Sequence, residues 1–204
     1  MVDDVIARAR GTAALTRGRE RPVGPQDDVT DQGYRLLVDA LAADQRGDTA
    51  TAGSWAVDAV ELFSSTNGVG DDVPYVWAVA ADLVRVDGPD DAWDRLVAVT
   101  DEGERVGVLP LALGAHRLHH LGVRQHEAGD LETAERSLRA AIEDFRAWGG
   151  VPFRARAEAD LARCLRALGR DDEADVVAAS ARAVLESLGA AAWLRELDGS
   201  PVRG

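Results

Sequence analysis

The chain has 204 residues, a net charge of -13, and a composition that is 46% apolar and 29% charged. These proportions are typical of folded globular proteins and exclude a disordered chain. The negative charge argues against general affinity for nucleic acid or anionic lipid, because the field of the whole chain repels polyanions. The single cysteine, Cys164, excludes an internal disulfide framework and suits a reducing cytoplasm, and its apolar neighbours predict a core residue.

Residues 1–31 form an N-terminal segment, which we expect to contain a helix and a loop. Residues 2–17 have the spacing of an amphipathic helix, and a loop with Pro22 and Pro25 follows, so the segment could be part of a further repeat. It lacks the basic start and apolar run of a signal peptide, and the chain has no stretch of 18 uninterrupted apolar residues. We therefore expect a cytoplasmic protein that does not bind membranes.

Residues 32–198 repeat one pattern at intervals of about 40 residues. In its clearest copy Gly122 lets a second helix approach closely, and Gly129 ends the first helix in a left-handed turn. The equivalent small residues of successive copies are 40, 42 and 40 positions apart, and they are Ala52, Ala92, Ala134 and Ala174. Such regular spacing is the mark of a helical repeat array.

The periodicity predicts an all-α fold, a right-handed solenoid of about four antiparallel helix pairs of tetratricopeptide type. The predicted helices are 32–46 with 49–65, 74–86 with 90–105, 110–128 with 131–147, and 152–168 with 171–188, followed by a capping helix over 191–197. Residues 199–204 form a tail. The period is longer than the 34 residues of the strict tetratricopeptide repeat and overlaps the range of HEAT-like repeats.

The array resembles the C-terminal helical region of actinobacterial MalT-like ATPase regulators, which often end in a LuxR-type DNA-binding module. The resemblance rests on Trp77, on Asp91-Ala92-Trp93 and on the run from Val108 to Leu113, and it extends over about residues 32–195. It implies a role in signalling or transcription regulation. The resemblance does not imply ATPase activity, because the chain has no Lys for a phosphate-binding loop. It does not imply DNA binding either, because too few residues follow Trp193 for a helix-turn-helix.

All four histidines fall on one predicted helix, and the repeat suggests that this helix faces the concave groove. The groove positions are His116, His119, Val123 and His126, and those of the next pair include Arg156, Arg163 and Arg166. We therefore predict a locally basic groove for a protein, an acidic peptide or a small anionic ligand. The alternative is that these arginines are solvated and pair with neighbouring acids such as Glu158 and Asp160.

No chemistry is assigned to the histidines. His116 and His120 lie one helical turn apart, but a metal site needs further ligands, so we predict no metal and no cofactor. The chain has no G-x-S-x-G, H-E-x-x-H or C-x-x-C motif and no glycine-rich phosphate loop. No catalytic residue is therefore predicted, and we expect a protein that is not an enzyme.

The sequence leaves three hypotheses for function. The first is a non-catalytic module for protein interaction or ligand sensing in a bacterial signalling or regulatory system. The second is a truncated or split transcriptional regulator whose NTPase and helix-turn-helix domains lie elsewhere, and the third is a small helical enzyme that uses the histidines. Monomer and homodimer are both left open.

Overall fold

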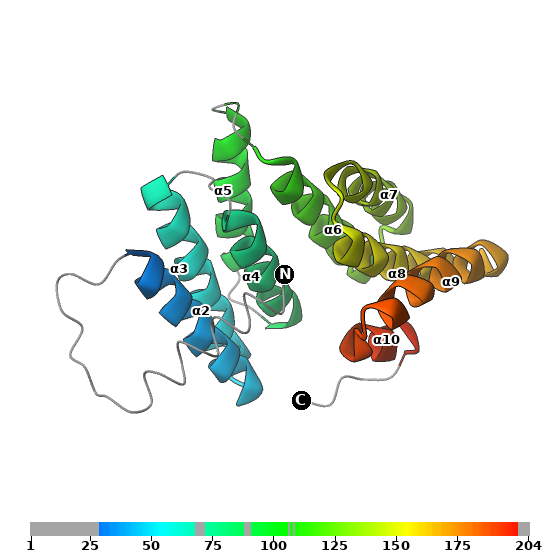
Figure 1. Cartoon of the computed structure of the whole chain (residues 1–204), viewed down its shortest axis with the longest axis horizontal. Helices are drawn as coiled ribbons and strands as arrows, with labels where there is room; N and C mark the ends of the chain where they lie inside the picture. The colour runs from blue at the N-terminus through cyan, green and yellow to red at the C-terminus, as the bar shows by residue number, and fades with distance from the viewer. Residues whose placement is uncertain (1–28, 68–71, 88–90, 106, 108, 200–204) are drawn as a thin grey trace. The chain divides into compact units, whose positions relative to one another are not determined.

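A computed structural model describes residues 29–67, 72–87, 91–105, 107 and 109–199. The predicted helix over residues 2–17 lies outside the described residues, as does most of the tail. Within the described part, every regular element is a helix and no strand is present (Figure 1). The chain divides into two compact units, of which the first ends at Leu113 and the second begins at Gly114.

The helices lie close to the bounds that the sequence predicted. They are α2 (Val29–Gln45), α3 (Thr49–Asn67), α4 (Val73–Asp87), α5 (Ala92–Arg105), α6 (Leu111–Glu127), α7 (Leu131–Trp148), α8 (Val151–Ala167), α9 (Asp171–Ser187) and α10 (Ala191–Leu197). Each begins and ends within three residues of its predicted bounds. The all-helical fold class is confirmed. None of the described helices is long and apolar enough to cross a membrane.

Glycines in the left-handed conformation separate the two helices of three pairs. Gly47, Gly129 and Gly169 have φ angles of 79°, 82° and 74°. In each turn the glycine N–H donates to the carbonyl three residues back, and the next N–H donates to the carbonyl five residues back. These bonds satisfy the last carbonyls of a helix, and glycine adopts the required φ without strain. The three turns therefore have one backbone structure.

The small residues that define the repeat are fully buried. Ala52, Ala92, Ala134 and Ala174 are each 0% exposed. Three of them stand at the fourth position of their helix, where the N–H donates to the carbonyl of the residue before the helix begins. A methyl group at this place lets the second helix of a pair pack closely against the first. The predicted anchors of the helix pairs are thus confirmed as core residues.

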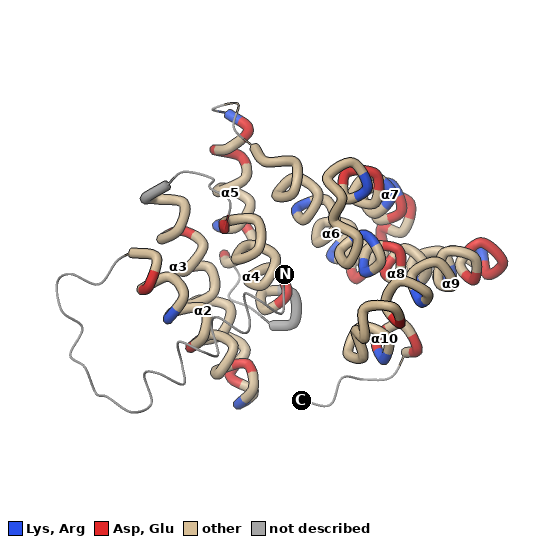
Figure 2. The backbone as a smooth tube through the Cα atoms, in the orientation of Figure 1, with Lys and Arg blue, Asp and Glu red and all other residues tan. Residues whose placement is uncertain are grey.

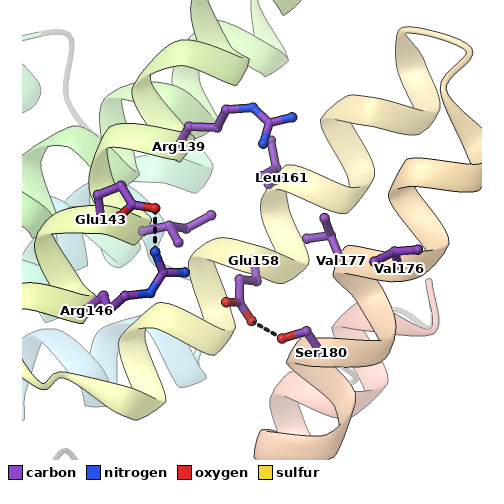
Figure 3. A pocket seen from close by; sticks show the side chains of 9 residues that line it. Arg139, Glu143, Arg146, Glu158, Leu161, Val176, Val177 and Ser180 are labelled. Atoms are coloured by element: carbon purple, nitrogen blue, oxygen red, sulfur yellow. Dashed lines mark hydrogen bonds and ion pairs between the residues drawn. The ribbon is translucent and has the colours of Figure 1, made fainter.

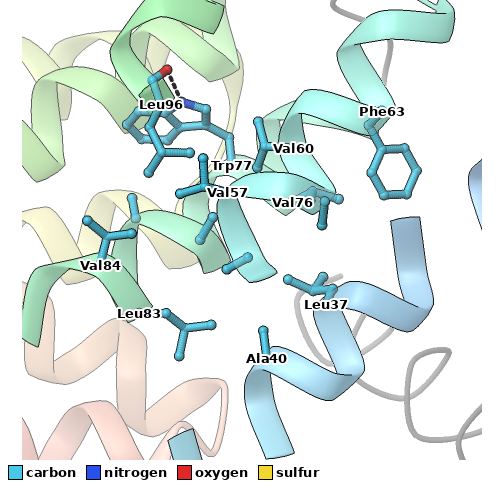
Figure 4. Packing of buried hydrophobic residues seen from close by; sticks show 14 of the residues in the cluster. Leu37, Ala40, Val57, Val60, Phe63, Val76, Trp77, Leu83, Val84 and Leu96 are labelled. Carbon is cyan, nitrogen blue, oxygen red and sulfur yellow. Dashed lines mark hydrogen bonds between the residues drawn. The ribbon is translucent and has the colours of Figure 1, made fainter. Parts of the chain in front are cut away.

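In the first unit, α2 to α5 pack around a core of Val, Leu and Ala side chains (Figure 4). Trp77 of α4 lies at its centre and is 0% exposed. Its Nε1–H donates to the carbonyl of Leu96 on α5 at 2.9 Å, which satisfies the polar edge of a buried indole (Figure 4). Trp93 packs edge-on against this ring, with 5.9 Å between the ring centroids.

In the second unit, α8 has α7 and α9 as packing neighbours. Gly122 of α6 faces α7 so closely that an added Cβ would lie 2.7 Å from Cγ of Leu138 and 3.2 Å from the carbonyl oxygen of Ala134. The close approach predicted for this glycine is confirmed. The first turn of α9 is acidic, as Figure 2 shows, and its carboxylates complement the positive end of the helix dipole.

Candidate functional site

The histidines of α6 lie mainly in the interior of the second unit. His116 is 1% exposed and stands edge-on to Phe153 and Phe145, with ring centroids 4.5 Å and 5.0 Å away. His120 is also 1% exposed, and His126 is half-buried. His116 is thus part of an aromatic cluster, and its ring is not on an open groove surface.

His119 belongs to a polar network centred on the buried carboxylate of Asp160. Its Nε2 lies 2.6 Å from Oδ2 of Asp160, and the two side chains are 2% and 5% exposed. Arg163, one turn further along α8, forms an ion pair with the same carboxylate. By the repeat spacing, His119 stands where Leu37 and Trp77 stand in the earlier pairs, and both of those are core residues.

The structure therefore differs from the open basic groove that the sequence predicted. His116, His119 and Val123 are at most 4% exposed, because the repeat position that they occupy faces the neighbouring helices. Spacing along a helix shows which residues share a face, but it does not show whether that face is covered. A contact between any of the predicted groove residues and a partner stays a prediction.

The three arginines of the predicted groove share one face of α8, and each has a neighbour. The guanidinium of Arg156 lies 5.6 Å above the ring of Trp193. Arg163 pairs with Asp160, and Arg166 pairs with Asp175 at 3.0 Å. Arg163 and Arg166 thus form ion pairs with neighbouring acids, as the alternative interpretation expected.

A hollow of about 250 Å³ opens between α7, α8 and α9 (Figure 3), and we call it the α8 hollow. Its apolar lining consists of Ile142, Leu161, Val176 and Val177, and its polar lining consists of Arg139, Glu143, Arg146, Glu158 and Ser180. In Figure 3 the two arginines come from α7, while Glu158 and Ser180 come from the helices opposite. The hollow lies wholly within the second unit, so its geometry is defined by that unit alone.

Glu158 is the buried ionic group of the α8 hollow. It is 6% exposed and accepts a hydrogen bond from the hydroxyl of Ser180 at 3.0 Å. Nη1 of Arg154, one turn earlier on α8, lies 3.3 Å from its other carboxylate oxygen. A buried carboxylate is costly unless such partners compensate for its lost hydration.

The arginines at the rim are more exposed and are already paired. Arg139 bonds to Glu135 and Glu173, and Arg146 pairs with Glu143. Partial burial alone would lower the pKa of Arg139, but its hydrogen bonds to the two glutamates outweigh burial and raise the pKa. The guanidinium of Arg139 therefore keeps its charge at any physiological pH.

Cys164 is a core residue, as the sequence predicted. Its side chain is 0% exposed, and its thiol donates to the carbonyl of Leu131 at 3.3 Å. Burial raises the pKa of this thiol, which keeps it protonated and unreactive. Elsewhere among the described residues, no three His, Cys, Asp or Glu side chains gather in a way that could hold a metal ion.

Comparison of the chain with protein-family models, with curated proteins and with solved structures found no match. The resemblance to MalT-like regulators stays a prediction, and functional inference relies on the geometry of the site. The α8 hollow combines an apolar floor, a buried carboxylate and exposed cations at its rim. Sequence reasoning missed it because its residues come from three helices whose mutual register no local pattern specifies.

Proposed function

We propose that this chain is a non-catalytic binding module that receives a segment of a partner protein in the α8 hollow. The scaffold in this proposal is a tetratricopeptide-like solenoid of four helix pairs with a capping helix. The observation that carries it is the continuity between the apolar floor of the hollow and Val176, which is 71% exposed at its edge.

The apolar lining supports a macromolecular partner. A single exposed apolar residue is ordinary on a protein surface, but Val176 continues the surface formed by Val177 and Leu161. A hollow of 250 Å³ is smaller than most sites that enclose a drug-sized molecule. One side chain of a partner could fill it, while the flanking residues of the same segment cover Val176.

The charged rim supports the proposal because its ion pairs can exchange partners. Arg146 and Glu143 are 54% and 67% exposed, and a pair of this kind contributes only about 0–1 kcal/mol. Either side chain can therefore leave this ion pair and bind a group on the partner at a small cost in free energy. The rim can thus adjust to a bound segment without change in the helices below it.

We further propose that the module acts in a bacterial signalling or regulatory system, for which the resemblance to MalT-like regulators is the support. The expectation of an acidic peptide or small anionic ligand concerns a different surface, the arginine face of α8. That expectation stays a prediction.

A photocrosslinking experiment tests the binding proposal. A photoreactive phenylalanine derivative is placed at position 176 or, as a matched control, at position 151, where Val151 is 46% exposed and does not line the hollow. Irradiation in cells that naturally express the protein should give a defined adduct at position 176 alone. The adduct partner is then purified, and Val176→Arg should weaken its binding at least tenfold, while Val151→Arg leaves the affinity unchanged. Equal adducts at both positions, or none at 176, would contradict the proposal.

A further inference from the structure

We infer that the partner enters the α8 hollow with a basic side chain, arginine or lysine, which contacts the carboxylate of Glu158. This inference rests on the proposed function and names the chemistry of the segment that binds. Three observations carry it: the place of Glu158 in the repeat, its burial, and the charges around it.

The repeat position of Glu158 is occupied by an apolar residue in each of the earlier pairs. At the spacings of 40, 42 and 40 that relate the alanine anchors, the equivalent residues of the earlier pairs are Leu36, Val76 and Leu118. Val76 is 1% exposed, and the other two are partly buried. The scaffold therefore accepts an aliphatic side chain at this position. A carboxylate here is not needed for helix packing, which leaves it available for binding.

Glu158 also keeps capacity to bind a cation. A carboxylate can accept about four hydrogen bonds. Within the described part of the chain, Glu158 has two partners, the hydroxyl of Ser180 and the guanidinium of Arg154. The Arg154 contact is 3.3 Å long, beyond the range of a short charge-assisted bond. A guanidinium or ammonium group in the hollow would add the stronger bonds that this buried anion lacks.

The other charges of the hollow do not reverse the preference of Glu158 for a cationic group. Arg139 and Arg146 are bound to acids on the surface and can turn toward solvent, whereas Glu158 is held in place by burial. A carboxylate entering the hollow would be placed beside this fixed negative charge. The net charge of -13 also attracts cationic segments to the chain as a whole and speeds their association.

The test uses three synthetic pentapeptides with capped ends, which carry arginine, citrulline or glutamate between flanking leucine and alanine residues. Citrulline has the shape of arginine without its charge. Binding is followed on the full chain through the backbone amide resonances of α7, α8 and α9. We expect the arginine peptide to shift the amides around Glu158 and Ser180, and to bind at least tenfold more tightly than the other two peptides.

Two variants connect the preference to Glu158. In Glu158→Gln the arginine and citrulline peptides should bind equally weakly. In Glu158→Leu, which restores the residue type of the earlier pairs, the melting temperature should stay the same or rise while the arginine preference is lost. Val151→Arg should leave the preference intact.

The outcomes separate this inference from the proposed function. An adduct at position 176 together with equal binding of all three peptides, or with no binding of the arginine peptide, would overturn the inference and leave the binding module standing. Persistence of the arginine preference in Glu158→Gln would overturn it as well. Absence of the adduct at position 176 would remove the proposed function itself, whichever peptides bind.

Discussion

Nε2 of His119 on α6 and Oδ2 of Asp160 on α8 lie 2.6 Å apart, although 41 residues separate them in the sequence. The contact joins the first helices of two successive pairs. Both groups are nearly excluded from solvent, so the pair is held in a low-dielectric interior. Arg163 shares the carboxylate, which makes Asp160 the centre of the network.

Removal of the central carboxylate should therefore be costly. We expect Asp160→Ala to lower the free energy of unfolding by about 3 kcal/mol, because it leaves buried polar groups without their anion. Urea denaturation followed by circular dichroism measures this. Asp175→Ala is the matched control, since Asp175 is 75% exposed and its pairing with Arg166 should contribute no more than about 1 kcal/mol. Equal losses in the two variants would show that burial of the network does not matter for stability.

Charge reversal should lower stability by different amounts at Arg163 and Arg166, which both lie on the predicted groove face. Arg163→Glu places a second carboxylate beside the buried Asp160, and we expect a loss of about 2 kcal/mol or more in the free energy of unfolding. Arg166→Glu faces Asp175 in solvent and should cost less than about 1 kcal/mol. Thermal melts of the two variants give the comparison. Of the two variants, only Arg166→Glu is then suitable for testing whether this face of α8 binds an acidic peptide. Similar melting temperatures of the two variants would contradict the conclusion that Arg163 supports the buried Asp160 while Arg166 pairs at the surface.

Gly122→Ala should destabilise the contact between α6 and α7. The new methyl group would lie 2.7 Å from Cγ of Leu138 and 3.2 Å from a backbone oxygen of α7, so the two helices must separate. Overpacking of this kind costs about 1–3 kcal/mol. A double-mutant cycle with Leu138→Ala, measured by chemical denaturation, should show that part of the cost disappears when the side chain that clashes is shortened. Strict additivity would mean that the strain lies elsewhere.

Acid should weaken the surface network around Glu135. Burial alone would raise the pKa of this carboxyl, but hydrogen bonds from Arg139 and Arg170 outweigh it and hold the pKa below its ordinary value of 4.5. A lowered folded-state pKa means that the contribution to stability is present above pH 4.5 and is lost as the pH falls through the folded-state pKa. Glu135→Gln should thus cost about 1 kcal/mol or less at pH 7 and less at pH 3 than at pH 7, by thermal melts at both values. A cost independent of pH would point to packing and away from charge.

The helices could be predicted because their signals are local. Gly47, Gly129 and Gly169 end helices through backbone conformations that other residues rarely adopt, and the small anchor residues recur at a spacing that chance does not produce. The glycine signal is local, and the spacing of the anchor residues can be read from the sequence without knowledge of how the helices pack. The bounds of each helix pair follow from them almost directly.

The site could not be predicted in the same way. The spacing of His116 and His119 is compatible with an exposed face or a covered one, and packing against α7 and α8 determines the outcome. The bond between Ser180 and Glu158 depends on the register of two helices, which side-chain packing sets. One signal was available in the sequence: Glu158 replaces an aliphatic residue of the earlier pairs. Departures from a repeat are thus a better guide to its function than agreement with it.

The three turns that share one backbone structure make the helix pair a transferable unit. Their hydrogen bonds join main-chain atoms, so they do not depend on which side chains stand at Ala43, Gln125 or Leu165. A second copy of residues 151–190, inserted after residue 190, would carry its own turns and its own buried alanine. The chain should therefore accept one further cassette, which would carry its own copies of Glu158 and Ser180 but not the α7 side chains that line the α8 hollow.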